Sequence, residues 1–337
     1  MKLMYIPKRF GAPSLQVIQQ CNDIISTYAA QGFDLTLRQL YYQMVSRALI
    51  ANKQSEYKRL GGIINDARLA GLVDWDRIVD RTRSVRTLSH WNTPADIIES
   101  AAYGFKVDYW TDQPVRLEVW IEKDALAGVF EPTCQDLDIP LFSCRGYTSQ
   151  SEVWSAAQRL ERHMRAGQKV VILHFGDHDP SGLDMTRDIR ERLELFTKHD
   201  WARWIGRQMR NAGEDPADRG AAMRWAAANA PWDTMLEIHR IALNFDQVQA
   251  YNPPPNPAKE TDARFAGYMA EHGDESWELD ALEPSVLDGL VRDTVEDFID
   301  RDKFEARKAE EQKGKDSLRT VANRWEEVEE QFGESAS

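Results

Sequence analysis

The most restrictive feature of this sequence is an alternation of strand-like and helix-like segments between residues 114 and 196. Three short apolar segments have the composition of buried strands, and a stretch with helical periodicity follows each of them. The strand-like segments are 114–122, 139–144 and 169–175, and the helix-like segments are 123–137, 149–167 and 181–196. Because a β-α-β-α-β-α order requires helical crossovers between parallel strands, we predict an α/β fold with a parallel, Rossmann-like sheet.

The residues before this region show helical periodicity and no long strand. Three helices are predicted at 12–30, 36–50 and 55–71, with Thr36 as the N-cap of the second. Short extended pieces follow them. This order suits a small helix-turn-helix or winged-helix-like domain that binds DNA, although the pattern is common in other proteins.

The charge distribution allows a nucleic-acid partner even though the whole chain is acidic. The formal net charge of the 337 residues is −13. Residues 38–90 carry ten Lys and Arg against five acidic residues, whereas residues 271–337 carry nine against 21. We therefore interpret the 38–90 surface either as a phosphate-binding surface or as ordinary solvated helix faces.

Several classes of protein are disfavoured by composition. The three cysteines are scattered, which argues against a zinc site or a disulfide framework. No apolar run of about 18 residues is present, and the first residues lack the apolar centre of a secretory signal. We expect a cytoplasmic, nucleoid-associated protein that is not bound to a membrane.

Acidic residues stand at the predicted ends of two strands. Glu122 closes "LEVWIE", and Asp177 and Asp179 follow "VVILHFG". Ligands of parallel sheets bind at the carboxyl ends of strands, and three carboxylates suit Mg²⁺ or Mn²⁺ rather than zinc. Taken alone, Asp-x-Asp-Pro-Ser-Gly is also an ordinary turn, and Glu122 an acid favoured at a helix N-terminus.

Two motifs in order give the chain a resemblance to a known family. "WIEKDAL", followed about 55 residues later by "GDHDPSGLDM", resembles the Toprim domain, and most of all the variant in the A subunit of topoisomerase VI and its meiotic double-strand-break relatives. Those proteins carry an Arg-x-x-Tyr-Tyr motif in an N-terminal winged-helix-like domain, and "LRQLYYQ" is similar to it at Arg38, Tyr41 and Tyr42. "WELDAL" at 277–282 is a weaker match to a late acidic motif.

The resemblance implies a DNA-cleaving tyrosine transesterase. Tyr42 would attack a DNA phosphate, Arg38 would steer the phosphate or the phenolate, and Lys123 would contact the DNA backbone. The metal ligands would be Glu122, Asp177 and Asp179. Since Tyr41 fits the apolar stripe of its helix, we expect Tyr42 to lie off that stripe and to be freer to act. The family also implies a homodimer, in which the tyrosine of one subunit meets the metal of the other, and a separate ATPase subunit.

We expect three segments along the chain. These are a winged-helix-like domain with the tyrosine motif at 1–100, a Toprim domain at 101–300 with an insertion near 203–232, and an acidic helical tail at 301–337. Three functions remain open: cleavage and rejoining of DNA through Tyr42, metal-dependent cleavage by water as in defence or mobile-element nucleases, and DNA binding without catalysis.

Overall fold

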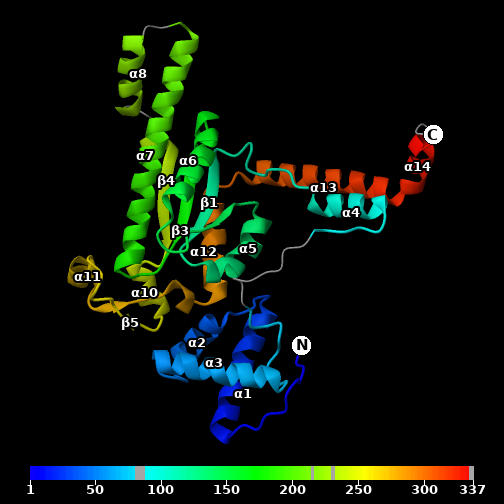
Figure 1. Cartoon of the computed structure of the whole chain (residues 1–337), viewed down its shortest axis with the longest axis vertical. Coiled ribbons are helices and arrows are strands. Elements are labelled where there is room, and N and C mark those ends of the chain that lie inside the picture. Colours follow the sequence, from blue (N-terminus) through cyan, green and yellow to red (C-terminus); the bar gives the residue numbers. More distant parts are fainter. Residues whose placement is uncertain (80–87, 214–215, 229–231, 334–337) are drawn as a thin grey trace. The chain divides into compact units, whose positions relative to one another are not determined.

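The computed structural model describes residues 1–79, 88–213, 216–228 and 232–333. The chain divides into two compact units, each built from two separate segments: Met1–Arg83 with Leu117–Thr294, and Ser84–Arg116 with Val295–Ser337 (Figure 1). Three arginines of the predicted basic surface lie outside the described residues, namely Arg81, Arg83 and Arg86. The domain boundaries expected near residues 100 and 300 stay predictions.

A four-stranded parallel sheet forms the centre of the first unit. The strands lie in the order β2-β1-β3-β4, with Val119 opposite Leu141 and Val170 opposite Leu236. Their bounds are Val115–Ile121 (β1), Leu141–Ser143 (β2), Lys169–Phe175 (β3) and Leu236–Ala242 (β4). The predicted α/β class with a parallel sheet is therefore confirmed, whereas the winged-helix and Toprim assignments stay predictions.

Helices cover both faces of this sheet (Figure 1). On one face, Trp120 and Ile172 of the strands share a core with Leu160 of α6 (Gln150–Arg165) and Leu193 of α7 (Pro180–Asn211). On the other face, Phe130 of α5 (Ala127–Asp136) contacts Phe175 of β3, with ring centroids 4.8 Å apart. Ile172 and Phe175 are three positions apart on β3, so their side chains point to opposite faces of the sheet. Strand β3 is therefore covered by helices on both sides.

The N-terminal helices form a second core in the same unit. They are α1 (Ala12–Ala30), α2 (Leu37–Ser46) and α3 (Gln54–Leu69). Thr36 caps α2 as predicted, in a capping box with Gln39, but the helix ends at Ser46 rather than continuing to residue 50. Within the described part of this region, the extended pairing is limited to the single bridges Met4–Ala70 and Leu35–Ile78.

The segment between β3 and β4 is helical, as predicted, and α7 runs on through the first part of the expected insertion. The Pro-rich stretch 252–265 holds only a two-residue strand. Between β3 and β4 lie also α8 (Pro216–Ala228) and α9 (Trp232–Met235). After β4 come α10 (Phe245–Tyr251), β5 (Asn256–Pro257), α11 (Phe265–His272), β6 (Glu275–Ser276), a short 3₁₀ helix (Leu279–Ala281) and α12 (Pro284–Glu296). Another short 3₁₀ helix, Asp124–Leu126, follows β1.

The second unit is a helical pair. Helix α4 (Pro94–Gly104) packs along α13 (Arg301–Asn323), and α14 (Trp325–Gly333) follows. Phe304 of α13 meets Tyr109 edge to face, and the buried Glu311 accepts a 3.2 Å hydrogen bond from the Val107 backbone nitrogen. The acidic C-terminal segment thus contributes a packed helix to this unit. Among the described residues, no helix is long and apolar enough to cross a membrane.

Leu160→Ala tests the core beneath the sheet. Leu160 is fully buried, so we expect the substitution to lower the free energy of unfolding by about 2–5 kcal/mol through lost contacts and a residual cavity. Urea denaturation followed by far-UV circular dichroism measures the change. Leu195→Ala on α7 is the matched control, because this leucine is 51 % exposed and its loss should cost less than about 0.5 kcal/mol. Equal losses in the two variants would contradict the packing described.

Candidate functional site

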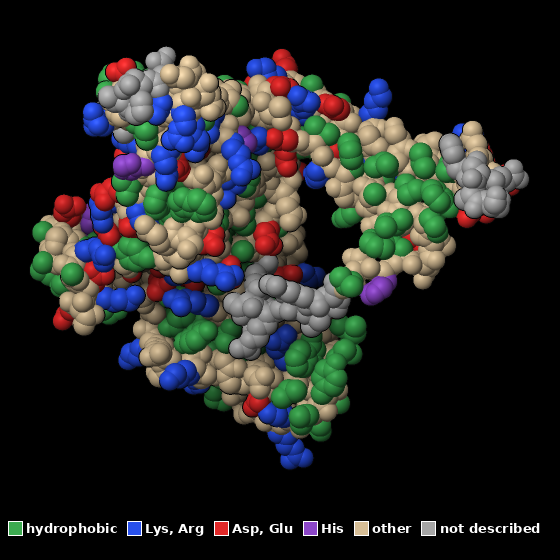
Figure 2. Space-filling view, turned by 45° about the horizontal axis from the view of Figure 1, so that its top comes forward, with side chains coloured by type: hydrophobic (Ala, Val, Ile, Leu, Met, Phe, Trp, Pro, Cys, Tyr) green, Lys and Arg blue, Asp and Glu red, His purple; other side chains and the backbone are tan. Residues whose placement is uncertain are grey.

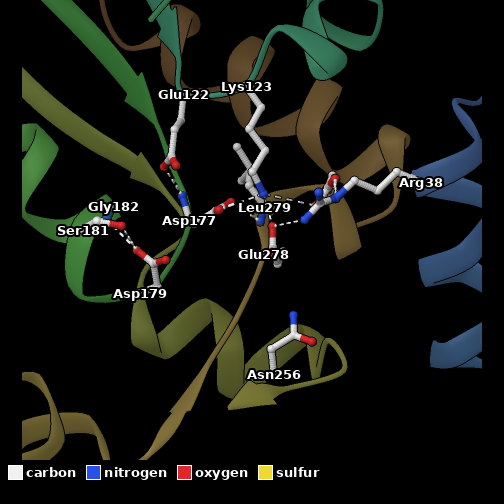
Figure 3. A network of polar contacts seen from close by, with 12 residues as sticks. Arg38, Glu122, Lys123, Asp177, Asp179, Ser181, Gly182, Asn256, Glu278 and Leu279 are labelled. Carbon is white, nitrogen blue, oxygen red and sulfur yellow. Dashed lines mark hydrogen bonds and ion pairs between the residues drawn. The ribbon is translucent and has the colours of Figure 1, made fainter. Parts of the chain in front are cut away.

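The candidate site lies where the strand order reverses. From β1 the chain crosses to β2 on one side, and β3 and β4 lie on the other, so the carboxyl ends of β1 and β3 flank the switch point. Crevices of this kind are the usual ligand sites of open parallel sheets. Glu122 follows β1 directly, and Asp177 follows β3 by two residues (Figure 3).

Glu122 fastens the two strand ends together. Its backbone nitrogen donates to the Phe175 carbonyl at 2.8 Å, and its Oε2 accepts from the Asp177 backbone nitrogen at 2.8 Å. Burial raises the pKa of this carboxyl, and the nearby carboxylate of Asp179 adds to the effect. The loop leaves little space here, because a Cβ built on Gly182 would lie 2.3 Å from the Asp177 carbonyl oxygen.

Asp177 and Asp179 have different partners, although they are two residues apart. Asp177 is buried, its Oδ1 accepts from the Leu279 backbone nitrogen at 2.8 Å, and its Oδ2 lies 2.7 Å from Lys123 Nζ. Asp179 is the N-cap of α7, and its Oδ1 accepts from the Gly182 backbone nitrogen at 2.6 Å. The two carboxylates therefore have different hydrogen-bond partners in this structure, and their joint role as metal ligands stays a prediction.

A distant acidic segment completes the site. The backbones of His178 and Trp277 exchange two hydrogen bonds, of 2.8 and 2.9 Å, which hold residues 277–281 beside the Asp177 loop. Glu278 and Asp280 thereby enter the network (Figure 3). This is the segment whose sequence gave the weaker of the motif matches.

Lys123 lies at the centre of these carboxylates. Its Nζ pairs with Asp177, with Glu278 and, at 3.5 Å, with Asp280. Burial by itself would lower the pKa of Lys123, but the carboxylates outweigh it and raise the pKa, so the ammonium stays charged. In this structure Lys123 therefore contacts the acidic cluster.

Arg38 joins the tyrosine helix to the same acidic segment. Its Nη2 lies 2.7 Å from Glu278 Oε2 and 3.5 Å from the Tyr42 hydroxyl, and its Nε lies 2.9 Å from Asp280 Oδ2. The guanidinium also stands 5.7 Å from the centre of the Tyr42 ring, within the range of a cation–π contact. A single cation thus contacts both the tyrosine and two carboxylates.

Tyr42 is no more exposed than its neighbour Tyr41, contrary to the expectation that it lies off the apolar stripe and is freer to act. Tyr41 and Tyr42 are each 5 % exposed, and both belong to the core of the N-terminal helices. Burial raises the pKa of Tyr42 to about 12, and the carboxylates of Glu278 and Asp280 act in the same direction. Residues of α1 and α3 belong to the same core as Tyr42, and the periodicity of α2 alone does not describe them.

The Pro-rich segment reaches the tyrosines through two asparagines. The Tyr41 hydroxyl donates to Asn52 Oδ1 at 2.9 Å, and Asn52 Nδ2 donates to Asn256 Oδ1 at 2.9 Å. Asn256 Nδ2 then lies 3.5 Å from the Tyr42 hydroxyl. These residues line a pocket of about 250 Å³ together with Arg38, Gln54 and Tyr57.

Arg240 is a site residue that sequence reasoning missed. It is half-buried beside the Asp177 loop and donates to the carbonyl oxygens of Gly182 (2.9 Å), Gly176 (3.1 Å), Asp177 and Leu243. Burial lowers its pKa to about 10 despite the surrounding carboxylates. No local sequence pattern marks Arg240 as a partner of this loop, because it lies 58 residues beyond Gly182 in the chain.

The donor set fits a hard divalent cation in its chemistry and its charge. Among the residues the structure describes, no three Asp, Glu, His or Cys side chains form a group that could hold a metal ion. Mg²⁺ commonly uses only one or two carboxylates, however, with waters and substrate phosphates supplying the rest. Five carboxyl groups lie near only three cationic side chains, and burial raises the pKa of two of these acids, Glu122 and Asp177. A divalent ion would stabilise their charged forms. The acids are Glu122, Asp177, Asp179, Glu278 and Asp280, and the cations are Arg38, Lys123 and Arg240.

Glu122→Gln tests the electrostatics of the loop. Because the pKa of Glu122 is raised in the folded protein, the folded state binds this proton more tightly than the unfolded chain does. Stability linked to it is present below the ordinary pKa of 4.5 and is lost as pH rises through the folded value. Glutamine keeps an acceptor for the Asp177 nitrogen and does not titrate.

We therefore expect the variant to gain stability relative to the wild type as pH rises above 4.5. Urea unfolding at several pH values between 4 and 8, without divalent ions, measures the difference. Glu191→Gln, at an exposed glutamate of α7, is the control. A stability difference that does not grow with pH would show that burial does not raise the pKa of Glu122.

Comparison with known proteins leaves the family open. No family model matches the chain, and no curated protein matches it.

Proposed function

We propose that this chain binds DNA and cleaves and rejoins it by metal-dependent tyrosine transesterification, as a topoisomerase VI A-like enzyme. The observation that carries the proposal is the position of Arg38, which contacts the Tyr42 hydroxyl and the acidic segment next to Lys123. The nucleophile, a cation able to bind phosphate and the carboxylate cluster thus belong to one network within one compact unit.

In this reaction the Tyr42 oxygen attacks the phosphorus of a DNA phosphodiester. A phosphotyrosyl bond forms, the bond to a deoxyribose oxygen breaks, and that oxygen takes up a proton as the phenol loses one. Because the new bond is again a phosphodiester, the reverse attack by the sugar hydroxyl rejoins the strand. Arg38 would hold the phosphate against Tyr42, since a planar guanidinium binds two phosphate oxygens at once.

Glu122, Asp177 and Asp179 would hold Mg²⁺ or Mn²⁺, which would polarise the phosphate and stabilise the charge on the leaving oxygen. Lys123 would exchange part of its contact with the carboxylates for contact with the DNA backbone. The helices α1 to α3 would form the winged-helix-like DNA platform within residues 1–100, and residues 101–300 would form the Toprim domain. The chain would act as a homodimer, with an ATPase, where one is needed, on a separate subunit.

Cleavage by a metal-activated water is the second candidate, and the burial of Tyr42 favours it. A hydroxyl with a pKa of about 12 in a side chain that is 5 % exposed is a weak nucleophile at neutral pH. In this reaction Tyr42 would only position Arg38, and Asp177 and Glu122 would stay essential. DNA binding without turnover is the third outcome that an experiment can give.

Trapping the reaction with denaturant separates these functions. The protein is incubated with supercoiled DNA and Mg²⁺ or Mn²⁺, stopped with detergent, and assayed for nicked or linear DNA and for protein–DNA adducts. We expect covalent adducts in the wild type that are reduced at least 1,000-fold in Tyr42→Phe, because phenylalanine lacks the attacking oxygen.

Tyr41→Phe is the matched control for this experiment. It removes a hydroxyl from an equally buried neighbour on the same helix, and it should leave adduct formation within about threefold of the wild type. Nicking that survives Tyr42→Phe but disappears in Asp177→Ala would establish the water reaction. Retained DNA binding without any cleavage by the wild type would rule out both reactions.

A mixing experiment then tests which subunit supplies Tyr42. In the described chain, Tyr42 and Asp177 are joined by Arg38, Glu278 and Lys123 of the same chain. If cleavage uses this arrangement, a mixture of Tyr42→Phe and Asp177→Ala proteins stays inactive, because each chain lacks one component. If the tyrosine acts on the partner's carboxylates, mixed dimers regain one complete site and nick the DNA. On these contacts we expect the inactive result, against the two-subunit arrangement that the resemblance implies; recovered nicking after co-refolding would overturn the same-chain assignment.

A further inference from the structure

A second concave site lies on α6 and α7, away from the carboxylates. It is a pocket of about 340 Å³. Its lining consists of one tryptophan, four arginines and three further polar residues: Trp154, Arg162, Arg165, Arg203, Arg207, Gln158, Glu161 and Asp200. Figure 2 shows Lys and Arg side chains gathered over this part of the surface, on a chain that is acidic as a whole.

The two acids of the pocket are already neutralised. Arg165 pairs with the buried Glu161 at 2.6 Å, and Arg203 pairs with Asp200. Arg162 and Arg207 are exposed and form no ion pair within the described part of the chain. The pocket therefore keeps a surplus of two positive charges carried by guanidinium groups, which bind phosphate oxygens in pairs.

Aromatic rings accompany these arginines. Trp154 is 48 % exposed at the pocket, an unusual exposure for so large an apolar ring. Nearby, the Arg165 guanidinium lies 5.4 Å from the Trp204 ring, which stacks on Trp201 with centroids 5.0 Å apart. Exposed aromatic rings beside arginines are the usual surface for unpaired bases and their phosphates.

The pocket lies near the amino end of β3, whereas the candidate active site lies at its carboxyl end. Arg162 and Arg165 lie in the last turns of α6, just before β3 begins, whereas Asp177 follows the end of β3. Along α7, Arg203 lies 23 residues beyond Pro180, which is about 35 Å at 1.5 Å per residue. A phosphate held at Tyr42 cannot reach it.

We propose that the α6–α7 pocket binds a segment of single-stranded nucleic acid, with Arg162 and Arg207 on the phosphates and Trp154 stacked on a base. An acidic peptide would satisfy the arginines but would leave Trp154 without a stacking partner, so the exposed ring favours nucleic acid. This site goes beyond the proposed cleavage reaction and does not depend on it. It gives the chain a second nucleic-acid contact, about 35 Å along α7 from the Pro180 end of that helix, which lies beside the carboxylates.

Fluorescence anisotropy with a labelled 20-nucleotide oligo(dT) tests the proposal. All proteins carry Tyr42→Phe, and the buffer contains EDTA, so cleavage contributes nothing and its absence would not affect the result. Arg162→Ala/Arg207→Ala should weaken binding at least tenfold at low salt and reduce the slope of log K against log salt by about 1.4, for two single-strand phosphate contacts. Trp154→Ala should weaken binding at least fivefold with little change in that slope.

Arg319→Ala/Arg324→Ala is the charge-matched control, because it removes two exposed arginines of the second unit. Circular dichroism and thermal melting check that each variant is folded. Affinity that is unchanged in both pocket variants, or equal losses in the control, would overturn the proposal. So would the same tenfold loss for an acidic peptide probe such as poly-Glu, since that would show a general anion site.

Discussion

The contacts of Lys123 and Arg38 with three carboxylates are the interaction on which the rest of this site depends. Removing a carboxylate from water is costly unless a cation and hydrogen bonds compensate it. Lys123 and Arg38 supply that compensation to Asp177, Glu278 and Asp280, which come from segments about 100 residues apart. The same contacts join the end of β1, the end of β3, the tyrosine helix and residues 277–281. Loss of Lys123 would remove the ion pair of the buried Asp177 and would weaken the link between residues 277–281 and the ends of β1 and β3.

Much of the frame of this site could be predicted from local sequence. The apolar runs of β1 and β3, the helices between them and the capping box at Thr36 all depend on residues within a few positions of one another. Once the strands are known to be parallel, their carboxyl ends must lie at the same end of the sheet. That β1 and β3 are neighbours, which brings Glu122 close to Asp177, comes from the strand order β2-β1-β3-β4, which periodicity does not give.

The directions of the site side chains could not be predicted from the sequence, because they depend on contacts between residues that are far apart in the chain. Asp177 turns toward Lys123 and Leu279, and residues near 279 could not be placed beside it from spacing alone. Asp179 instead obeys a local rule, since its carboxylate caps α7 as an aspartate before Pro-Ser-Gly commonly does. The Asp-x-Asp sequence is thus a turn and part of an acidic cluster at once, since Asp179 caps α7 and Asp177 pairs with Lys123. Arg240 and Asn256 escaped notice for the same reason, as their partners lie 58 to 214 residues away.

The chemistry of Tyr42 depends on what Arg38 contacts. With a pKa of about 12, deprotonating this phenol at pH 7 costs about 7 kcal/mol, a large part of any catalytic effect. The carboxylates of Glu278 and Asp280 increase that cost twice, by repelling the phenolate and by sharing the Arg38 guanidinium. A divalent cation that neutralises these acids would lower the pKa of Tyr42 and would leave the Arg38 guanidinium free to bind a DNA phosphate. In the proposed reaction Tyr42 would then become a better nucleophile only when the metal is bound.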